Sequence, residues 1–219
     1  IFTFFSSFGQ SYFLGLFNSS IREALSITHG QFGSIYASAT LCSSLLLIWV
    51  GKKIDDVNIF KFAFFVTILL SFACFFFSRV TSVFLLFIAI FLMRFSGQGM
   101  MSHTASTTIS RYFTKTRGRA LSISWFGLSS AEFIMPVLMV YLLTIIDWQN
   151  LWLIFSISVL IILPIVSFLL IKNLNLDSRE ANDENIKHVE IKQWRRRDVL
   201  KDYRFYIISS NMLAMPWIF

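Results

Sequence analysis

Apolar segments long enough to cross a lipid bilayer fill most of this chain, and they limit its fold more than any other feature. A spanning helix needs about 20 mostly apolar residues. The sequence contains six complete or nearly complete segments and the start of a seventh: Ile1–Ser19, Phe32–Val50, Phe60–Phe77, Val83–Ser110, Ala120–Ile146, Leu151–Ile171 and Phe205 onward. Hydrophobic residues make up 56% of the chain and charged residues 14%, against roughly 45–50% and 25% in soluble domains. The chain is therefore predicted to be an all-α membrane protein.

Basic residues are concentrated in alternate loops between these segments. The loops after the second, fourth and sixth segments hold 16 of the 19 Lys and Arg residues. The opposite loops hold only Arg22 and Arg79. Because basic loops tend to stay in the cytoplasm, the 2–3, 4–5 and 6–7 loops are predicted to be cytoplasmic. The membrane is expected to be the plasma membrane, which in a bacterium is the inner membrane.

Three parts are predicted along the chain. Residues 1–172 form a six-helix transmembrane bundle, residues 173–203 a cytoplasmic interdomain loop, and residues 204–219 the start of helix seven. The chain begins without an initiator Met and ends inside an apolar run, so it is expected to be part of a longer protein with a second bundle as its partner. The basic run Arg195–Arg197 is typical of a loop beside a membrane, and a nucleic-acid partner is not predicted.

Arg94, His103 and Glu132 are the only charged or histidine side chains well inside the apolar segments. A charge at the bilayer centre costs roughly 2.5–3.5 kcal/mol on insertion scales. Arg94 and Glu132 lie near the middle of consecutive segments. Two roles stay open for them: an ion pair that only locks the two helices together, or a substrate-binding Arg and a proton-coupling Glu in a polar pathway. His103 is expected to be packed or hydrogen-bonded.

Four short motifs accompany these residues. Gly51-Lys52-Lys53-Ile54-Asp55 follows the second segment, Arg94-Phe95-Ser96-Gly97-Gln98-Gly99 lies in the fourth, Arg117-Gly118-Arg119-Ala120-Leu121 opens the fifth, and Gly127-Leu128-Ser129-Ser130-Ala131-Glu132 with Pro136 follows within it. Together they resemble the loop signature, the intramembrane Arg and the fifth-helix signature of the major facilitator superfamily. Asp56 stands where that loop signature usually has Arg. The first segment, with Phe8-Gly9-Gln10-Ser11-Tyr12-Phe13, looks like the first helix of bacterial members related to organic-anion and monocarboxylate carriers.

This resemblance implies the N-terminal half of a twelve-helix secondary transporter that moves a small, anionic solute by alternating access, with proton coupling as an open question. The implied substrate-binding residues are Gln10, Tyr12, Arg94, Gln98, Trp125 and Glu132, with Glu132 also the proton carrier. The implied cytoplasmic gate contains Gly51, Asp55, Arg117 and Arg119. The alternative is a polytopic membrane protein that does not transport, such as a sensor or an assembly factor.

Other classes of protein are not indicated. The sequence has no phosphate loop, hydrolase elbow or catalytic cluster, so an enzyme is not predicted. No cofactor or metal site is predicted either, because Cys42 and Cys74 have no metal-ligand spacing and are expected to be small packing residues. The 26 Phe residues are expected to face lipid.

Overall fold

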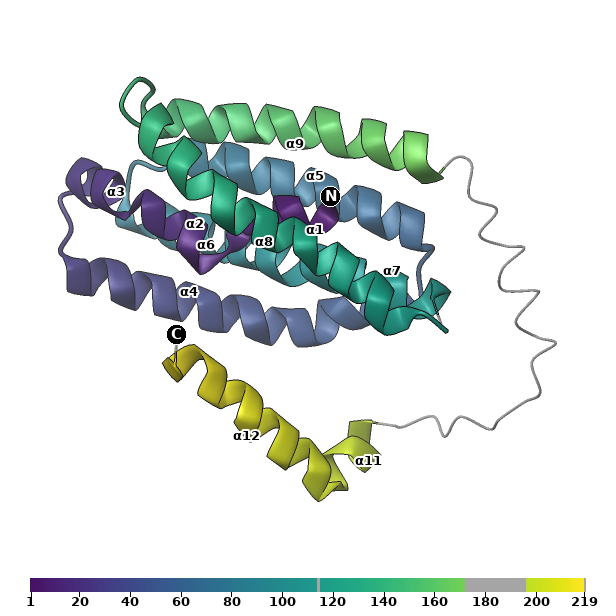
Figure 1. Cartoon of the computed structure of the whole chain (residues 1–219). Helices are drawn as coiled ribbons and strands as arrows, with labels where there is room; N and C mark the ends of the chain where they lie inside the picture. The colour runs from purple at the N-terminus through teal and green to yellow at the C-terminus, as the bar shows by residue number, and fades with distance from the viewer. Residues whose placement is uncertain (114, 172–195, 219) are drawn as a thin grey trace. The chain divides into compact units, whose positions relative to one another are not determined.

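The computed structural model describes residues 1–113, 115–171 and 196–218 (Figure 1). It contains two compact units, Ile1–Leu176 and Asp177–Phe219. Within the described ranges all regular secondary structure is helical, which confirms the predicted all-α fold. The boundary expected after residue 172 stays a prediction, and most of the predicted interdomain loop, residues 172–195, lies outside the described ranges.

Among the described residues, five helices are long and apolar enough to cross a membrane. The first is α4 (His29–Val50), which η2 (Gly51–Asp55) extends, and the second is α5 (Ile59–Ser78). The third is continuous and consists of α6 (Val83–Met93), η3 (Arg94–Met101) and α7 (Ser102–Tyr112). The fourth is α8 (Arg117–Leu142) and the fifth is α9 (Trp148–Ile171). Segments two to six were therefore predicted correctly, with ends that differ by five residues or fewer.

Polar side chains fix where several of these helices begin. Before α4, the Thr28 hydroxyl accepts from the Gln31 N–H at 3.3 Å, and the Gln31 side chain accepts from the Thr28 N–H at 2.8 Å. Asn58 accepts from the Phe60 N–H at 2.9 Å before α5. These caps satisfy backbone N–H groups that have no partner within the helix.

The first segment is not the single span that was predicted over Ile1–Ser19. It is divided into α1 (Phe2–Phe5), the 3-10 turn η1 (Ser6–Gly9), α2 (Ser11–Leu16) and α3 (Asn18–Leu25). At Gln10 the backbone is extended, with φ −79° and ψ 154°. Serine and glycine around this point are weak helix formers, and contacts with η3 described below hold the broken conformation.

Aromatic side chains form much of the buried core, so the expectation that the Phe residues face lipid was only partly right. Trp152 of α9 is fully buried. It packs against Phe77 of α5, with ring centroids 4.5 Å apart, while Phe8 stacks on Phe155 at 4.9 Å. Other Phe residues, such as Phe133 of α8, are largely exposed. The cluster attaches the broken first segment to α5 and α9.

A pair of buried serines also joins α5 to α9. The Ser71 hydroxyl donates to the Ser156 carbonyl at 2.9 Å, and the Ser156 hydroxyl donates to the Ser71 carbonyl at 2.8 Å. Figure 1 shows α5 and α9 side by side along their length. Interhelical hydrogen bonds of this kind supplement close packing between helices in a membrane.

The second unit contains α11 (Arg196–Lys201) and α12 (Tyr203–Ile218). The Asp202 carboxylate accepts from the Arg204 N–H at 2.9 Å, and the Tyr206 hydroxyl donates to the Leu200 carbonyl at 2.9 Å. These bonds fix the turn between the two helices. α12 begins at Tyr203, two residues before Phe205, and its assignment as the start of helix seven stays a prediction.

Candidate functional site

The break in the first segment lies directly against η3. Gly9 and Gly97 touch backbone to backbone: a Cβ built on Gly97 would lie 2.7 Å from the Gly9 nitrogen and 2.8 Å from its Cα. Only glycine at both positions permits this approach. Because η3 is a π-helix, a form that is rare and frequent at functional sites, two unusual backbone segments meet at one place.

Arg94, the first residue of η3, holds the broken segment through its guanidinium. Its Nη1 donates to the Gly9 carbonyl at 3.0 Å and to the Ser11 hydroxyl at 3.1 Å. The guanidinium carbon also lies 5.3 Å from the centre of the Tyr36 ring, on α4. The Gly9 carbonyl is freed by the helix break, and Arg94 replaces the hydrogen bond that a continuous helix would have supplied.

Arg94 does not form an ion pair with Glu132. Within the described ranges the one ion pair joins Arg111 to Asp55. Arg94 is buried, with 8% of its surface exposed, and its Nε has no hydrogen-bond partner among the described residues. The interpretation that an Arg94–Glu132 pair locks two helices together is therefore wrong for this structure, and no carboxylate of the described residues forms an ion pair with Arg94.

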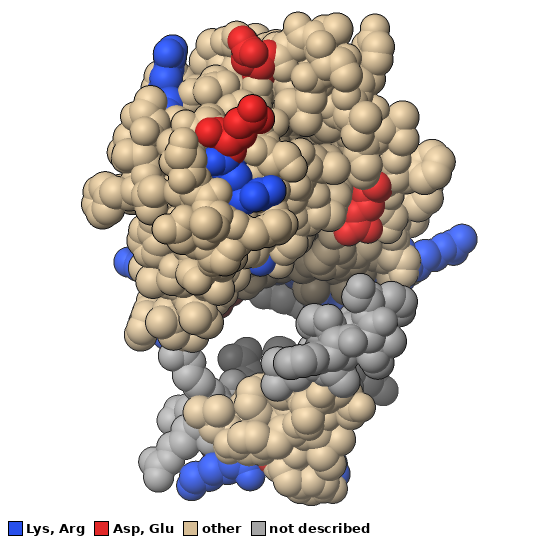
Figure 2. Space-filling model, turned by 90° about the vertical axis from the view of Figure 1, so that its left-hand side faces the viewer, with Lys and Arg blue, Asp and Glu red and all other residues tan. Residues whose placement is uncertain are grey.

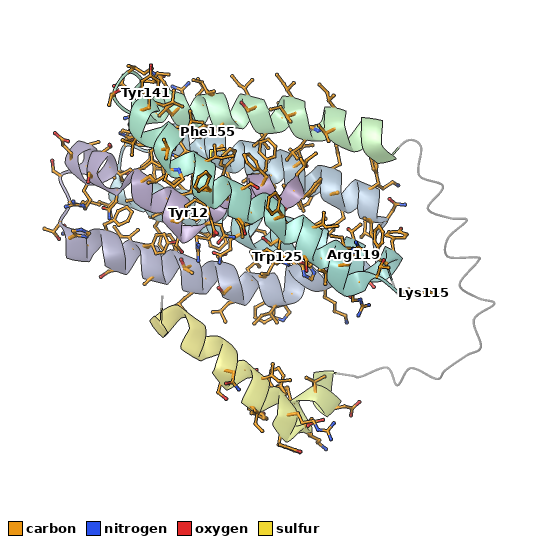
Figure 3. All side chains as sticks on the ribbon, in the orientation of Figure 1. Tyr12, Lys115, Arg119, Trp125, Tyr141 and Phe155 are labelled. Carbon is orange, nitrogen blue, oxygen red and sulfur yellow. The ribbon has the colours of Figure 1, made fainter. Side chains whose placement is uncertain are left out.

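Glu132 lies on the exposed side of α8, two turns from the half-exposed Trp125. The Glu132 carboxylate is near enough to Tyr12 of α2 for the two groups to interact electrostatically. The Tyr12 hydroxyl is buried and has no hydrogen-bond partner in the part of the chain that is described. Figure 3 shows Tyr12 and Trp125 in the middle region of the bundle, on α2 and α8 respectively.

The two predicted glutamines lie on either side of the glycine contact. Gln10 follows Gly9 in the chain and Gln98 follows Gly97, and both glutamines are half-buried. The backbone of Gln98 is itself close to Gly9. The structure thus brings Gln10, Gln98 and Arg94 together around the break, whereas Glu132 interacts with Tyr12 and Trp125 lies two turns away from Glu132 on α8.

His103 and Asp55 connect η2 to the far half of the fourth segment. The His103 Nε2 lies 2.9 Å from the Gly51 carbonyl oxygen, which confirms that His103 is hydrogen-bonded. The Arg111 guanidinium donates to the Asp55 carboxylate at 3.1 Å. A Cβ at Gly51 would lie 3.5 Å from Nε2, an ordinary van der Waals contact, so the imidazole packs closely on this position.

This end of the bundle, the basic end, holds the described basic residues of two loops: Lys52, Lys53, Lys61, Arg111, Lys115, Arg117 and Arg119. Arg117 donates to the Ser110 carbonyl at 2.8 Å and so bridges the turn between α7 and α8. Arg119 is exposed. Lys115 and Arg119 lie at one end of the bundle and Tyr141 at the other (Figure 3).

The opposite end has a hollow of about 590 Å³ between α3 and the turn from α8 to α9. Glu23 and Asp147 are among the residues that line it. Figure 2 faces this end and shows a mostly uncharged surface with a few acidic and basic side chains. Its sparse charge contrasts with the basic end.

Comparison with known proteins adds one decisive observation. The family model described as Major Facilitator Superfamily matches residues 1–219, the whole chain. The chain belongs to the Major Facilitator Superfamily. No curated protein and no solved structure matches it. As a member of this superfamily the protein is a multi-pass membrane protein of a secondary-transporter family, and its long apolar helices agree with that assignment.

Sequence reasoning about this superfamily member missed two residues of the site. Ser11 accepts a hydrogen bond from Arg94, and Tyr36 lies over the guanidinium. Tyr36 is the only tyrosine in the second apolar segment, which is a usable signal. Its distance in sequence from every recognised motif explains why it was overlooked.

Proposed function

We propose that this protein transports a small organic anion by alternating access around a site beside the break in the first segment. The observation that carries the proposal is the buried Arg94 without a carboxylate partner among the described residues. A buried charge is expensive unless it is paired. A substrate carboxylate would supply the missing negative charge, and a guanidinium suits carboxylates because its donors are fixed in a planar fork.

Gln10, Gln98, Tyr12 and Trp125 are proposed to line the remainder of the substrate path. Gln10 and Gln98 flank Arg94, where their amides can donate or accept hydrogen bonds. Tyr12 is partly buried, with a hydroxyl that has no partner within hydrogen-bond distance in the described ranges, and Trp125 offers an exposed ring on α8. A mostly apolar path with a few placed polar groups is the usual composition of a small-molecule site.

Glu132 is proposed as the residue that carries a coupling proton. No basic residue in the described ranges lies within ion-pair distance of its carboxylate. The carboxylate interacts electrostatically with Tyr12. A titratable acid within a membrane-spanning helix is a common element of proton relays. Binding of an anion near Arg94 would then neutralise a positive charge. Protonation of Glu132 would neutralise a negative charge in the same bundle.

The basic end is proposed to face the cytoplasm, in the plasma membrane, and to contain the inner gate. The Asp55–Arg111 ion pair and the bond from His103 to the Gly51 carbonyl tie η2 to α7. Arg117 and Arg119 begin α8 at the same end. These contacts join the end of the second segment to the fourth segment. If these two segments move during transport, they must either move together or break the contacts.

Substituting Arg94 tests the proposal. Arg94→Lys keeps the positive charge but loses the planar fork, so uptake of anions into proteoliposomes should fall at least about tenfold, as for loss of one hydrogen bond to a charged group. Arg94→Gln should reduce uptake further. A panel of acetate, lactate, succinate and benzoate supplies the substrates. Thermal stability in detergent must show that each variant is folded.

Arg79→Gln is the matched control. Arg79 also lies over an aromatic ring, 5.6 Å from the centre of Phe75, but it is exposed beyond the end of α5. Its replacement should leave uptake unchanged. Equal uptake by folded Arg94→Gln and Arg79→Gln proteins would remove Arg94 from the substrate site.

A further inference from the structure

Ser11 stands at the exposed side of the Arg94 guanidinium. It is the first residue of α2, immediately after the break, and its side chain is exposed, whereas Arg94 is buried. Its hydroxyl oxygen accepts two hydrogen bonds: one from Arg94 Nη1 at 3.1 Å and one from the Tyr36 hydroxyl at 2.9 Å. Three residues from three different segments therefore meet at one oxygen atom.

The two accepted bonds determine what Ser11 can do next. A serine hydroxyl has one hydrogen to donate and two lone pairs that accept. Arg94 and Tyr36 occupy both lone pairs, so the oxygen cannot accept a further strong hydrogen bond. The Ser11 hydrogen itself has no acceptor in the described residues. The exposed group is consequently a donor only.

The environment strengthens this donor. Hydrogen bonds in a chain polarise one another. Ser11 accepts from a cationic guanidinium whose other Nη1 bond goes to the Gly9 carbonyl. Nε of the same guanidinium is buried without a partner in the described ranges. The Ser11 hydroxyl is therefore one exposed donor directly coupled to the Arg94 charge.

We propose that Ser11, oriented by Tyr36, is the residue that donates directly to a carboxylate oxygen of the transported anion. This inference rests on the proposed function and refines it: Arg94 supplies the charge and the guanidinium donors, Ser11 adds a direct hydrogen bond beside them, and Tyr36 orients Ser11. The ligand class is a solute with a carboxylate group, which presents acceptors only. A neutral amide analogue lacks the negative charge that Arg94 attracts, so the site discriminates against it.

The test measures the affinity of the purified protein for acetate, lactate, succinate and benzoate, and for acetamide and lactamide, together with transport. Ser11→Ala removes the donor and should raise the Kd and KM for the bound anions about tenfold or more, with little change in maximal rate. Ser11→Thr keeps the hydroxyl at an exposed position and should remain within about threefold of the unaltered protein. Tyr36→Phe keeps the ring over Arg94 but frees one lone pair of Ser11, so its affinity should lie between these two.

Ser34→Ala is the control, because Ser34 is an exposed serine whose hydroxyl bonds only to the Gly30 carbonyl of its own helix. Anion affinities of Ser11→Ala and Ser34→Ala that agree within twofold would overturn the assignment of Ser11 while leaving the transport of anions intact. A thermal shift of the Ser11→Ala protein with unchanged anion affinity would make Ser11 purely structural. If the unaltered protein binds none of the anions, both this inference and the proposed function fail for that class.

Discussion

Replacing Gly97 by alanine should destabilise the bundle strongly, because the contact between Gly97 and Gly9 has no space for a methyl group. The new Cβ would lie 2.7 Å from the Gly9 nitrogen, 2.8 Å from its Cα and 3.4 Å from the Ser6 carbonyl oxygen. Carbon atoms in favourable contact are about 3.5–4.0 Å apart. The first segment and η3 would therefore have to separate by about 1 Å.

The energetic consequence has two parts. Overpacking costs about 1–3 kcal/mol, and here the neighbours are backbone atoms that cannot rotate away. Separation would also weaken the bond from Arg94 to the Gly9 carbonyl, and hydrogen bonds to charged groups contribute about 1.5–3 kcal/mol. We expect a loss of about 3 kcal/mol or more, which lowers the Tm by at least about 6 °C in a chain of this length.

Cys74 provides the assay. It is fully buried in α5, whereas Cys42 is exposed. In a Cys42→Ser background, a thiol-reactive fluorophore should label Cys74 only on unfolding. Gly15→Ala is the control, because nothing lies within 4 Å of a Cβ at that position and alanine favours a helix over glycine by about 1 kcal/mol. Equal Tm values for Gly97→Ala and Gly15→Ala would refute the close contact.

Two further predictions concern orientation and coupling. Single cysteines introduced at Lys115 and Gln149 should be labelled from opposite sides of the membrane. The cysteine at Lys115 should be labelled from the cytoplasm, because basic loops tend to remain inside. Labelling of both from one side would contradict the proposed orientation. Glu132→Gln resembles the protonated acid, so it should abolish accumulation driven by a pH gradient yet preserve exchange of substrate; accumulation under such a gradient would exclude Glu132 as the proton carrier.

Much of the helical framework could be predicted because it depends on local composition. Long apolar runs bounded by charged loops identify spanning helices whatever their neighbours are. The hydrogen bonding of His103 could also be predicted, since a polar side chain among apolar residues must find a partner. His103 contacts the Gly51 carbonyl.

The broken first segment was beyond local reasoning because it depends on residues far away in the chain. The carbonyl of Gly9 is satisfied by Arg94, 85 positions further on. The π-helix of η3 adds a second difficulty. The α-helical rotation of 100° per residue predicts which residues share a helix face with Arg94. That prediction fails after Arg94, because a turn of π-helix contains more residues than a turn of α-helix. Such a backbone change has no simple sequence signal.

The reciprocal bonds between Ser71 and Ser156 have a practical consequence for measuring movement in this transporter. Each serine donates to the other's backbone carbonyl, so sliding or rotation of α5 against α9 would break two buried hydrogen bonds at once. The distance between these two helices is consequently expected to stay constant. Spectroscopic labels placed on this pair give a constant reference distance, against which displacements of α4 or α8 during the transport cycle can be read.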